Sequence, residues 1–197
     1  MGKKFMLRNL YDRTMLLADH PKALWILAVM SFAESSFFPI PPDVLLIPMV
    51  LAAPTRAWRI AFVCSASSVA GGIFGYIIGA YFFDVAGQPI VDFYHLQAQF
   101  ERFQLLYNEW GAIIVGVAGF SPIPYKVFTI ASGVTNLDIT TFIISSAISR
   151  SARFFLVAAL LWKYGTPIRS FIENHLAKLS LLFCILLVGM FVALKYI

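Results

Sequence analysis

Charged residues are scarce in this sequence, in which Asp, Glu, Lys and Arg together make up 13% of 197 residues. Hydrophobic residues make up 60%, and the mean hydropathy is +0.81, values far above those of a soluble domain. The composition therefore excludes a soluble protein and predicts an integral membrane protein with one compact domain over residues 1–197. The net charge of +5 is better explained by orientation in a membrane than by a nucleic-acid partner, and we expect no such partner.

Groups that bind metals or act as nucleophiles are also few. The two cysteines, Cys64 and Cys184, lie in apolar segments without metal-ligand spacing, so we assign them a packing role. The histidines, His20, His95 and His175, lie outside the hairpins and spans predicted below. Because no nucleophile is paired with a base, we expect no enzyme, no metal and no cofactor. A membrane enzyme acting on lipid phosphates and a purely structural assembly factor remain as alternatives.

Prolines interrupt two apolar stretches that would otherwise read as membrane helices. Pro39, Pro41 and Pro42 interrupt the first stretch, and Pro122 and Pro124 repeat the same Pro-Ile-Pro pattern in a later one. Proline lacks a backbone donor and clashes with the preceding turn, so neither stretch can be one unbroken helix across a bilayer. Each is predicted to be the tip of a re-entrant helical hairpin.

The predicted elements repeat in the order hairpin, span and amphipathic segment. Hairpins are predicted over 22–53 and 110–134, spans over 58–83, 139–162 and 179–194, and amphipathic surface helices over 5–18 and 88–110. The repeat divides the chain into 22–110, 111–178 and a C-terminal helix over 179–197. Since one crossing separates the hairpins, they would enter from opposite faces. The predicted fold class is an all-α polytopic membrane protein with two inverted repeats.

Small residues recur at every fourth position of the first predicted span. The stripe consists of Ser67, Gly71, Gly75 and Gly79. Such a stripe lets the backbone of another helix approach closely, so it predicts the tightest packing seam of the chain.

Lysine and arginine are distributed unevenly between the predicted loops. If both proline segments are re-entrant, one side of the membrane holds ten Lys and Arg against three acids, and the other holds two against five. Basic loops are retained on the cytoplasmic side of membranes, so the bias predicts a cytoplasmic N-terminus.

Five ionisable residues fall inside the predicted apolar segments. They are Glu34, Asp43, Lys126, Arg150 and Arg153. A charge at mid-bilayer costs about 2.5–3.5 kcal/mol on insertion scales, so five are tolerable only if they face one another or water. We expect one cluster at the hairpin tips. The Pro-Ile-Pro offset sets Asp43 and Lys126 at equivalent positions, and we expect these two to pair.

The cluster admits two interpretations. Three bases against two acids leave one positive charge over, which favours binding of an anion, and membrane carboxylates beside a water path can exchange protons. Alternatively, Glu34 and Asp43 are structural ion-pair partners of Arg150 and Arg153 that only orient the hairpins.

Three motifs in order resemble the bacterial DedA family, which shares the VTT (SNARE-associated) domain. The motifs are Glu34 with FPIPPD at 38–43, GFSPIPYK at 119–126 with ASG at 131–133, and SRSARF at 149–154. The resemblance covers roughly residues 20–170, and the shorter YqaA-type branch is the most similar. It implies two inverted re-entrant hairpins in the bacterial inner membrane and a role in lipid transport. Characterised relatives flip undecaprenyl phosphate or phospholipid, and eukaryotic relatives are scramblases.

The resemblance also implies that the membrane acids and arginines matching Glu34, Asp43, Arg150 and Arg153 are required, often with the proton-motive force. Lys126 departs from the pattern, because many members have arginine there and lysine lacks the bidentate fork that grips phosphate.

The sequence as a whole predicts a flippase-like transporter whose partner is a membrane lipid, and it leaves open whether the protein is a monomer or a homo-oligomer. In this interpretation Lys126, Arg150 and Arg153 bind the headgroup phosphate, while Glu34 and Asp43 exchange a proton or balance charge. The alternative is a proton-coupled transporter of a small solute or ion that uses the same cluster. A lateral gap toward the bilayer distinguishes the two, because only a lipid needs one.

Overall fold

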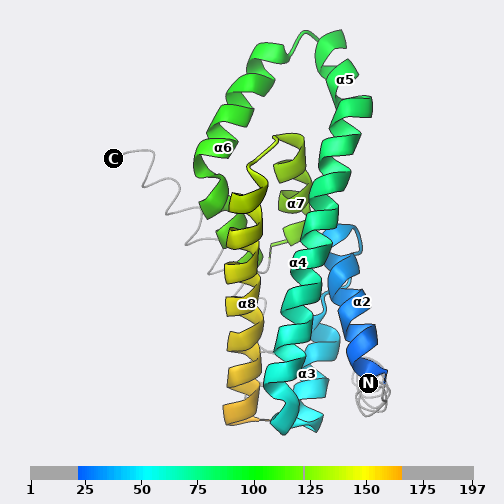
Figure 1. Cartoon of the computed structure of the whole chain (residues 1–197), viewed down its shortest axis with the longest axis vertical. Helices are drawn as coiled ribbons and strands as arrows, with labels where there is room; N and C mark the ends of the chain where they lie inside the picture. Colours follow the sequence, from blue (N-terminus) through cyan, green and yellow to red (C-terminus); the bar gives the residue numbers. More distant parts are fainter. Residues whose placement is uncertain (1–21, 122, 166–197) are drawn as a thin grey trace, which may run out of the picture.

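The computed structural model of the chain describes residues 22–121 and 123–165, which contain helices and their connections and no strand (Figure 1). In chain order the elements are α2 (Ala23–Ser36), α3 (Asp43–Ala52), the 3-10 turn η1 (Pro54–Arg56), α4 (Ala57–Phe82), the π-helical turn η2 (Phe83–Gly87), α5 (Gln88–Phe93), α6 (Gln97–Phe120), α7 (Tyr125–Val134) and α8 (Ile139–Tyr164). The predicted helices over 5–18 and 179–194, together with Pro122, lie outside the described residues.

The first proline segment is the tip of a helical hairpin. Helix α2 has 14 residues and α3 has 10, which at ~1.5 Å per residue is about 21 Å and 15 Å. Both are too short to cross a hydrocarbon core of ~30 Å. In Figure 1 the chain ascends along α2, turns at residues 37–42 and returns along α3 toward the end where it began. The hairpin shape is as predicted, and its re-entrant placement in a membrane stays a prediction.

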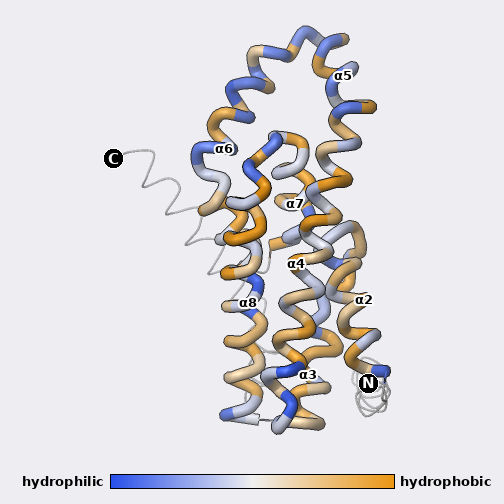
Figure 2. Tube along the Cα trace, in the orientation of Figure 1, coloured by the Kyte–Doolittle hydropathy of each residue, from blue (hydrophilic) through white to orange (hydrophobic). Residues whose placement is uncertain are grey.

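Two helices are long and apolar enough to cross a membrane. One is the rod of 40 residues from Pro54 to Phe93, which comprises η1, α4, η2 and α5, and the other is α8 with 26 residues. At ~1.5 Å per residue the rod is about 60 Å long, or twice a hydrocarbon core, so its upper part extends beyond the bilayer if α4 crosses it upright. Figure 2 shows more hydrophilic residues along this upper part than along the lower bundle.

The predicted amphipathic helix over 88–110 is wrong in its bounds. Residues 88–93 complete the rod, and the chain reverses at 94–96, where His95 has a positive φ of 54°. Residues 97–110 then continue without a break into the first arm of the second hairpin, and together they form α6. The ring of Phe100 stacks on that of Phe83 with centroids 4.5 Å apart, which holds α6 against the rod below the reversal.

The second proline segment forms a hairpin of opposite direction. Helix α6 descends in Figure 1, the chain turns between α6 and α7, and the 10-residue helix α7 ascends again before α8 descends through the lower bundle. The two hairpin tips therefore point toward each other at middle height. A twofold relation between the two halves stays a prediction.

Helix α4 carries the close contacts that position both hairpins. A Cβ added at Gly71 would overlap the backbone carbonyl of Phe32 in α2, and one at Gly79 would overlap that of Ile130 in α7. Gly133 of α7 approaches the carbonyl of Tyr76 in the same way. The predicted small-residue stripe is thus the seam on which α2 and α7 are seated.

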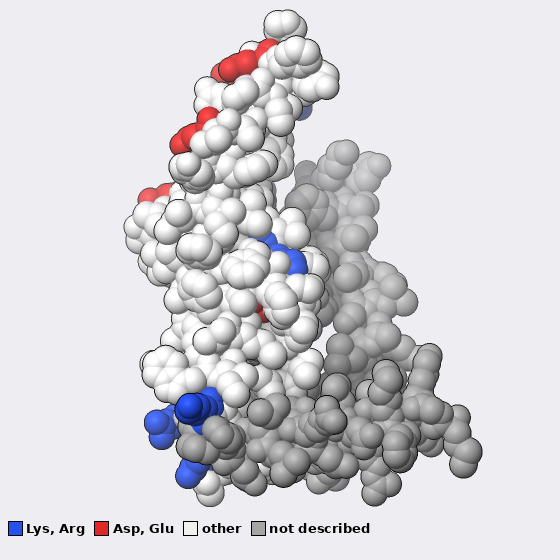
Figure 3. All heavy atoms as spheres, turned by 90° about the vertical axis from the view of Figure 1, so that its right-hand side faces the viewer, with Lys and Arg blue, Asp and Glu red and all other residues white. Residues whose placement is uncertain are grey.

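On the face shown in Figure 3 the acids lie mainly toward the upper end, and Lys and Arg lie at the lower end and in a group at middle height. The exposed acids on η2, α5 and α6 are Asp84, Asp92, Glu101 and Glu109. Arg56 and Arg59 lie where α4 begins, and Lys163 lies where α8 ends. The two ends of the described bundle therefore differ in charge, with most of the exposed acids at one end and three exposed bases at the other.

Replacing a seam glycine should destabilise the fold. Gly79→Ala places a methyl group against the Ile130 carbonyl, and we expect it to lower the free energy of unfolding by about 1–3 kcal/mol, the usual cost of overpacking. The measurement is the melting temperature of the detergent-purified protein.

The matched control is Gly116→Ala in α6, where an added Cβ meets nothing within 4 Å among the described residues. The higher helix propensity of alanine should leave this variant as stable as the parent or slightly more stable. Equal melting temperatures of the two variants would contradict the close approach of α4 and α7.

Candidate functional site

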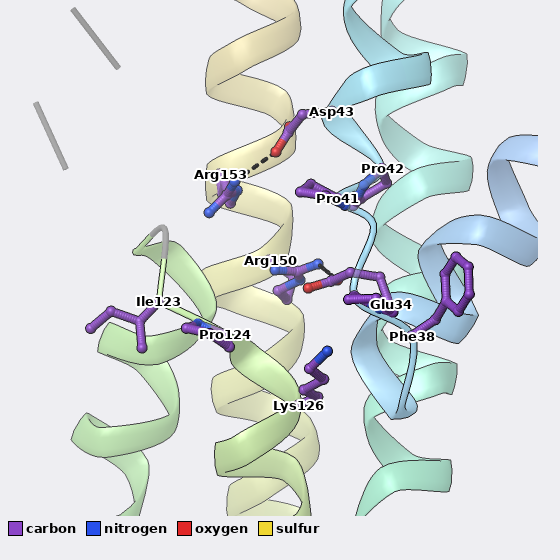
Figure 4. A pocket seen from close by; sticks show the side chains of 11 residues that line it. Glu34, Phe38, Pro41, Pro42, Asp43, Ile123, Pro124, Lys126, Arg150 and Arg153 are labelled. Carbon is purple, nitrogen blue, oxygen red and sulfur yellow. Dashed lines mark hydrogen bonds and ion pairs between the residues drawn. The ribbon is translucent and has the colours of Figure 1, made fainter. Parts of the chain in front are cut away.

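The two hairpin tips and α8 enclose a cavity of about 240 Å³ (Figure 4). All five ionisable residues singled out in the sequence line it, as do four of the five predicted tip prolines, Pro39, Pro41, Pro42 and Pro124. The fifth, Pro122, lies outside the described residues. The prediction that the membrane charges gather in one cluster at the tips agrees with this arrangement.

Helix α8 passes from one apolar cluster to another with the cavity between them. Phe142 belongs to a buried cluster formed with α6 and α7, and Ala158 and Leu161 belong to a second cluster formed with α2, α3 and α4. Arg150 and Arg153 lie between the two, three residues apart and therefore on one face of the helix. Apolar surroundings strengthen electrostatic interactions, so Arg150 and Arg153 interact more strongly with nearby charges here than they would in water.

Arg150 is enclosed on every side. Its Nη2 lies 2.8 Å from Glu34 Oε2, and its Nε donates to the hydroxyl of Ser68 in α4. Its guanidinium carbon lies 4.8 Å from the ring centroid of Tyr125 and 4.6 Å from that of Phe154, both within cation–π range. The side chain is only 3% exposed. Arg150 thus ties α2 to α8 and α4.

A pair of serine hydroxyls supports the Arg150–Glu34 pair. Ser35 Oγ lies 3.2 Å from Glu34 Oε2 and 2.7 Å from Ser68 Oγ. Because each hydroxyl can donate and accept, the carboxylate and the guanidinium are joined through them into one connected network. Such a network fixes side-chain positions more firmly than a single ion pair does.

Arg153 connects both hairpin tips to α8. Its Nη2 lies 2.7 Å from Asp43 Oδ2 at the start of α3, and its Nη1 donates to the Ser121 carbonyl of the second tip at 2.6 Å. Both Asp43 and Arg153 have side chains that are 21% exposed. Two buried atoms of this pair, Asp43 Oδ1 and Arg153 Nε, have no hydrogen-bond partner in the described part of the chain.

The expected pairing of Asp43 with Lys126 is wrong. The carboxylate of Asp43 pairs with Arg153 instead, and Lys126 lines the cavity without an ion pair to any described residue. Equivalent positions in the Pro-Ile-Pro repeat do not meet, because α8 places an arginine closer to the start of α3. In Figure 4 Lys126 and Arg153 lie on opposite sides of the Arg150–Glu34 pair.

The two ion pairs are those of the structural interpretation of the cluster, in which each acid neutralises one arginine. That interpretation leaves Lys126 as the remaining positive charge of the five. A cavity lined by one positive charge more than negative charges favours a bound anion.

Three contributors were missed in the sequence. Ser68 is next to Ser67 of the small-residue stripe, and Ser35 is next to Glu34. Each is therefore a hydroxyl residue adjacent to a residue that the sequence analysis names, and this adjacency is the signal that could have found it. Tyr125 was quoted only as part of a motif, although its buried ring covers Arg150 and its hydroxyl bonds Ser146.

The fold and the cavity define an all-helical membrane protein with a charged pocket between two helical hairpins. Comparison with family models gives a match to the VTT domain over residues 40–163. The chain therefore belongs to the DedA family of VTT-domain proteins.

Two relatives extend the likeness over most of the chain. An uncharacterized protein of Haemophilus influenzae is 44% identical over 169 residues, which cover 84% of this chain and 88% of that protein. An uncharacterized protein of Histophilus somni is 41% identical over 169 residues, with the same coverage. No solved structure matches. The comparisons thus define the family and leave the substrate to be argued from the pocket.

A charge swap tests the observed partner of Asp43. Asp43→Arg or Arg153→Asp alone leaves like charges facing each other, and we expect a loss at the lower end of the ~3–5 kcal/mol typical when a buried pair is broken, because this pair is partly exposed. The double variant should recover part of the melting temperature and the folded yield. Recovery stays partial, since an aspartate at 153 cannot donate to the Ser121 carbonyl.

The comparison pair is Asp43→Lys with Lys126→Asp. These two side chains do not pair in the structure, so the double variant should be no more stable than the two single changes predict together. Recovery in this pair, and none in the pair with Arg153, would contradict the described geometry.

Proposed function

We propose that this protein is a transporter that moves a phosphate-bearing lipid, such as undecaprenyl phosphate or a phospholipid, across the bacterial inner membrane. The observation that carries the proposal is the positive charge left over in the cavity, where Lys126 has no acidic partner among the described residues. Lys126, Arg150 and Arg153 create the positive field that attracts the headgroup phosphate.

The size of the cavity supports a headgroup as the bound part. Its volume of about 240 Å³ lies below the ~300–1,000 Å³ of pockets that enclose drug-sized ligands. A phosphate fits such a space, and a lipid tail does not. The tail would therefore stay in the bilayer while the phosphate passes between the hairpin tips.

The charge distribution supports an orientation in which the end of the bundle where α2 and α4 begin and α8 ends faces the cytoplasm. The exposed basic residues Arg56, Arg59 and Lys163 lie at that end, and positively charged ends are retained in the cytoplasm. With that orientation the two hairpins would enter from opposite faces, and rocking of one against the other would expose the cavity alternately. Glu34 and Asp43 would balance the charge or carry the coupled proton.

The alternative function is proton-coupled transport of a small solute or ion. The same small volume favours it, because a free inorganic anion would fit where a headgroup phosphate fits. The two functions differ in whether the bound phosphate is attached to a tail.

Transport in reconstituted vesicles tests the proposal. Purified protein should move a fluorescent lipid phosphate between leaflets, and Lys126→Ala should slow this by at least about tenfold, since a lost charged hydrogen bond is worth ~1.5–3 kcal/mol. Lys163→Ala removes the same side chain from the exposed end of α8 and should transport at the parental rate.

Vesicles loaded with radiolabelled inorganic phosphate supply the second arm. Movement of free phosphate without movement of the lipid would establish the alternative function. If the parent protein moves neither substrate, or if Lys126→Ala moves the lipid as fast as Lys163→Ala does, the proposed role of the cavity is wrong.

A further inference from the structure

We propose that Asp43 is a built-in substitute for the substrate phosphate: in this structure it occupies Arg153, and an arriving phosphate displaces it and releases the start of α3 from α8. This inference rests on the proposed function, because it takes the phosphate as ligand, and it adds how the site responds to that ligand.

The two ion pairs of the cavity differ in how firmly they are held. Arg150 is 3% exposed, lies between two aromatic rings and shares a hydroxyl network with Glu34. Arg153 and Asp43 are each 21% exposed and have no such network around them. An incoming ligand can therefore reach Arg153, whereas Arg150 is a positioning residue that fixes the first hairpin.

The contact between Asp43 and Arg153 is incomplete. It joins Arg153 Nη2 to Asp43 Oδ2, and it leaves Arg153 Nε and Asp43 Oδ1 without partners in the described part of the chain. An arginine offers Nε and one Nη as a fork that receives two oxygens of the same anion. A phosphate has enough oxygens to accept from both donors, so it satisfies the Nε that Asp43 leaves unpaired.

Displacement would change what Arg153 connects. Arg153 bonds Asp43 of the first hairpin and the Ser121 carbonyl of the second. A phosphate that takes the Asp43 position leaves the bond to Ser121 in place, so Arg153 would remain attached to the second hairpin alone. The start of α3 then loses its polar contact with α8, while Glu34 still holds α2 and the apolar cluster shared by α3 and α8 remains.

Helix α3 is suited to such a release. The bond from Arg153 to Asp43 is the one side-chain hydrogen bond between α3 and α8 within the described ranges. Asp43 is also the first residue of α3, where the amide groups of the helix start favour a negative charge. The displaced carboxylate therefore keeps a favourable interaction at its own helix end.

The test compares anion binding by two matched variants of the full chain in detergent. Asp43→Asn keeps the size of the side chain and removes its charge, so the competitor for Arg153 is weakened. If Asp43 occupies Arg153 in about nine-tenths of the parent molecules, the apparent affinity of the parent for phosphate is about tenfold lower than that of an unblocked site. We therefore expect Asp43→Asn to bind a short-chain alkyl phosphate about tenfold more tightly than the parent. Arg153→Ala should bind it at least tenfold more weakly.

Glu34→Gln is the matched change in the other pair. Because Arg150 is enclosed, freeing it from Glu34 should lower the melting temperature and should tighten binding less than Asp43→Asn does, since it raises the positive field of the cavity and uncovers no accessible donor. Inorganic phosphate, titrated in parallel, distinguishes the source: tighter binding of both probes by Asp43→Asn assigns the response to the phosphate group itself, and tighter binding of the alkyl phosphate alone assigns it to a lipid headgroup.

A second measurement needs no variant. The amides of Val44, Leu45 and Leu46 bond the carbonyls of Pro41 and Pro42, so hydrogen exchange there reports on the start of α3. Saturating alkyl phosphate should speed exchange at these amides in the parent protein. Slower or unchanged exchange would overturn the proposal, as would a folded Asp43→Asn variant that binds no more tightly than the parent.

These outcomes are separate from those of the transport test. A parent that moves lipid phosphate while Asp43→Asn shows no gain in affinity would retain the proposed function and lose the displacement. A gain in affinity in a protein that transports nothing would retain the displacement and lose the proposed function.

Discussion

The structure depends on the cost of keeping charges among apolar residues. Five ionisable side chains lie between two apolar clusters, where an unpaired charge is unfavourable by several kcal/mol. Arg150 and Arg153 meet this cost by binding Glu34, Asp43 and the Ser121 carbonyl, which belong to three different segments. The same contacts that neutralise the charges therefore fix both hairpin tips against α8, and the cavity exists because the tips are held apart in this way.

Helix α4 supplies the geometric half of the arrangement. Its glycines let the backbones of α2 and α7 approach α4 closely. This close approach places the end of α2 and the start of α7 beside α8. Ser68 on the same helix belongs to the polar network, because its hydroxyl accepts a hydrogen bond from Arg150 Nε. Close packing and charge pairing are thus parts of one design, since a wider seam would move Glu34 and Ser68 away from Arg150.

The sequence predicts which charged residues line the cavity, and it predicts their pairing poorly. Charged residues inside apolar segments must be gathered, so Glu34, Arg150 and Arg153 could be placed together without a structure. The partner of Asp43 could not be predicted, because the repeat shows that Asp43 and Lys126 are at equivalent positions in the sequence and does not show which side chains face each other in the fold. The reversal at His95 was missed for a related reason: the spacing of aromatic residues continues across it, and a positive φ at one residue leaves no periodic signal. Ser68 was missed because one serine in an apolar helix is usually packing.

The asymmetry between the two tips is the last physical consequence. The repeated Pro-Ile-Pro segments place an acid at one tip and a lysine at the other, and only the acid is paired. A symmetric arrangement with Asp43 bound to Lys126 would have left Arg153 without an acidic partner among the described residues. By pairing Asp43 with Arg153, the fold keeps the charge of Lys126 facing the cavity and joins the start of α3 to an arginine that the other hairpin also holds. In the proposed displacement an entering anion would act first on this shared arginine, so that its binding would loosen the contact between α3 and α8.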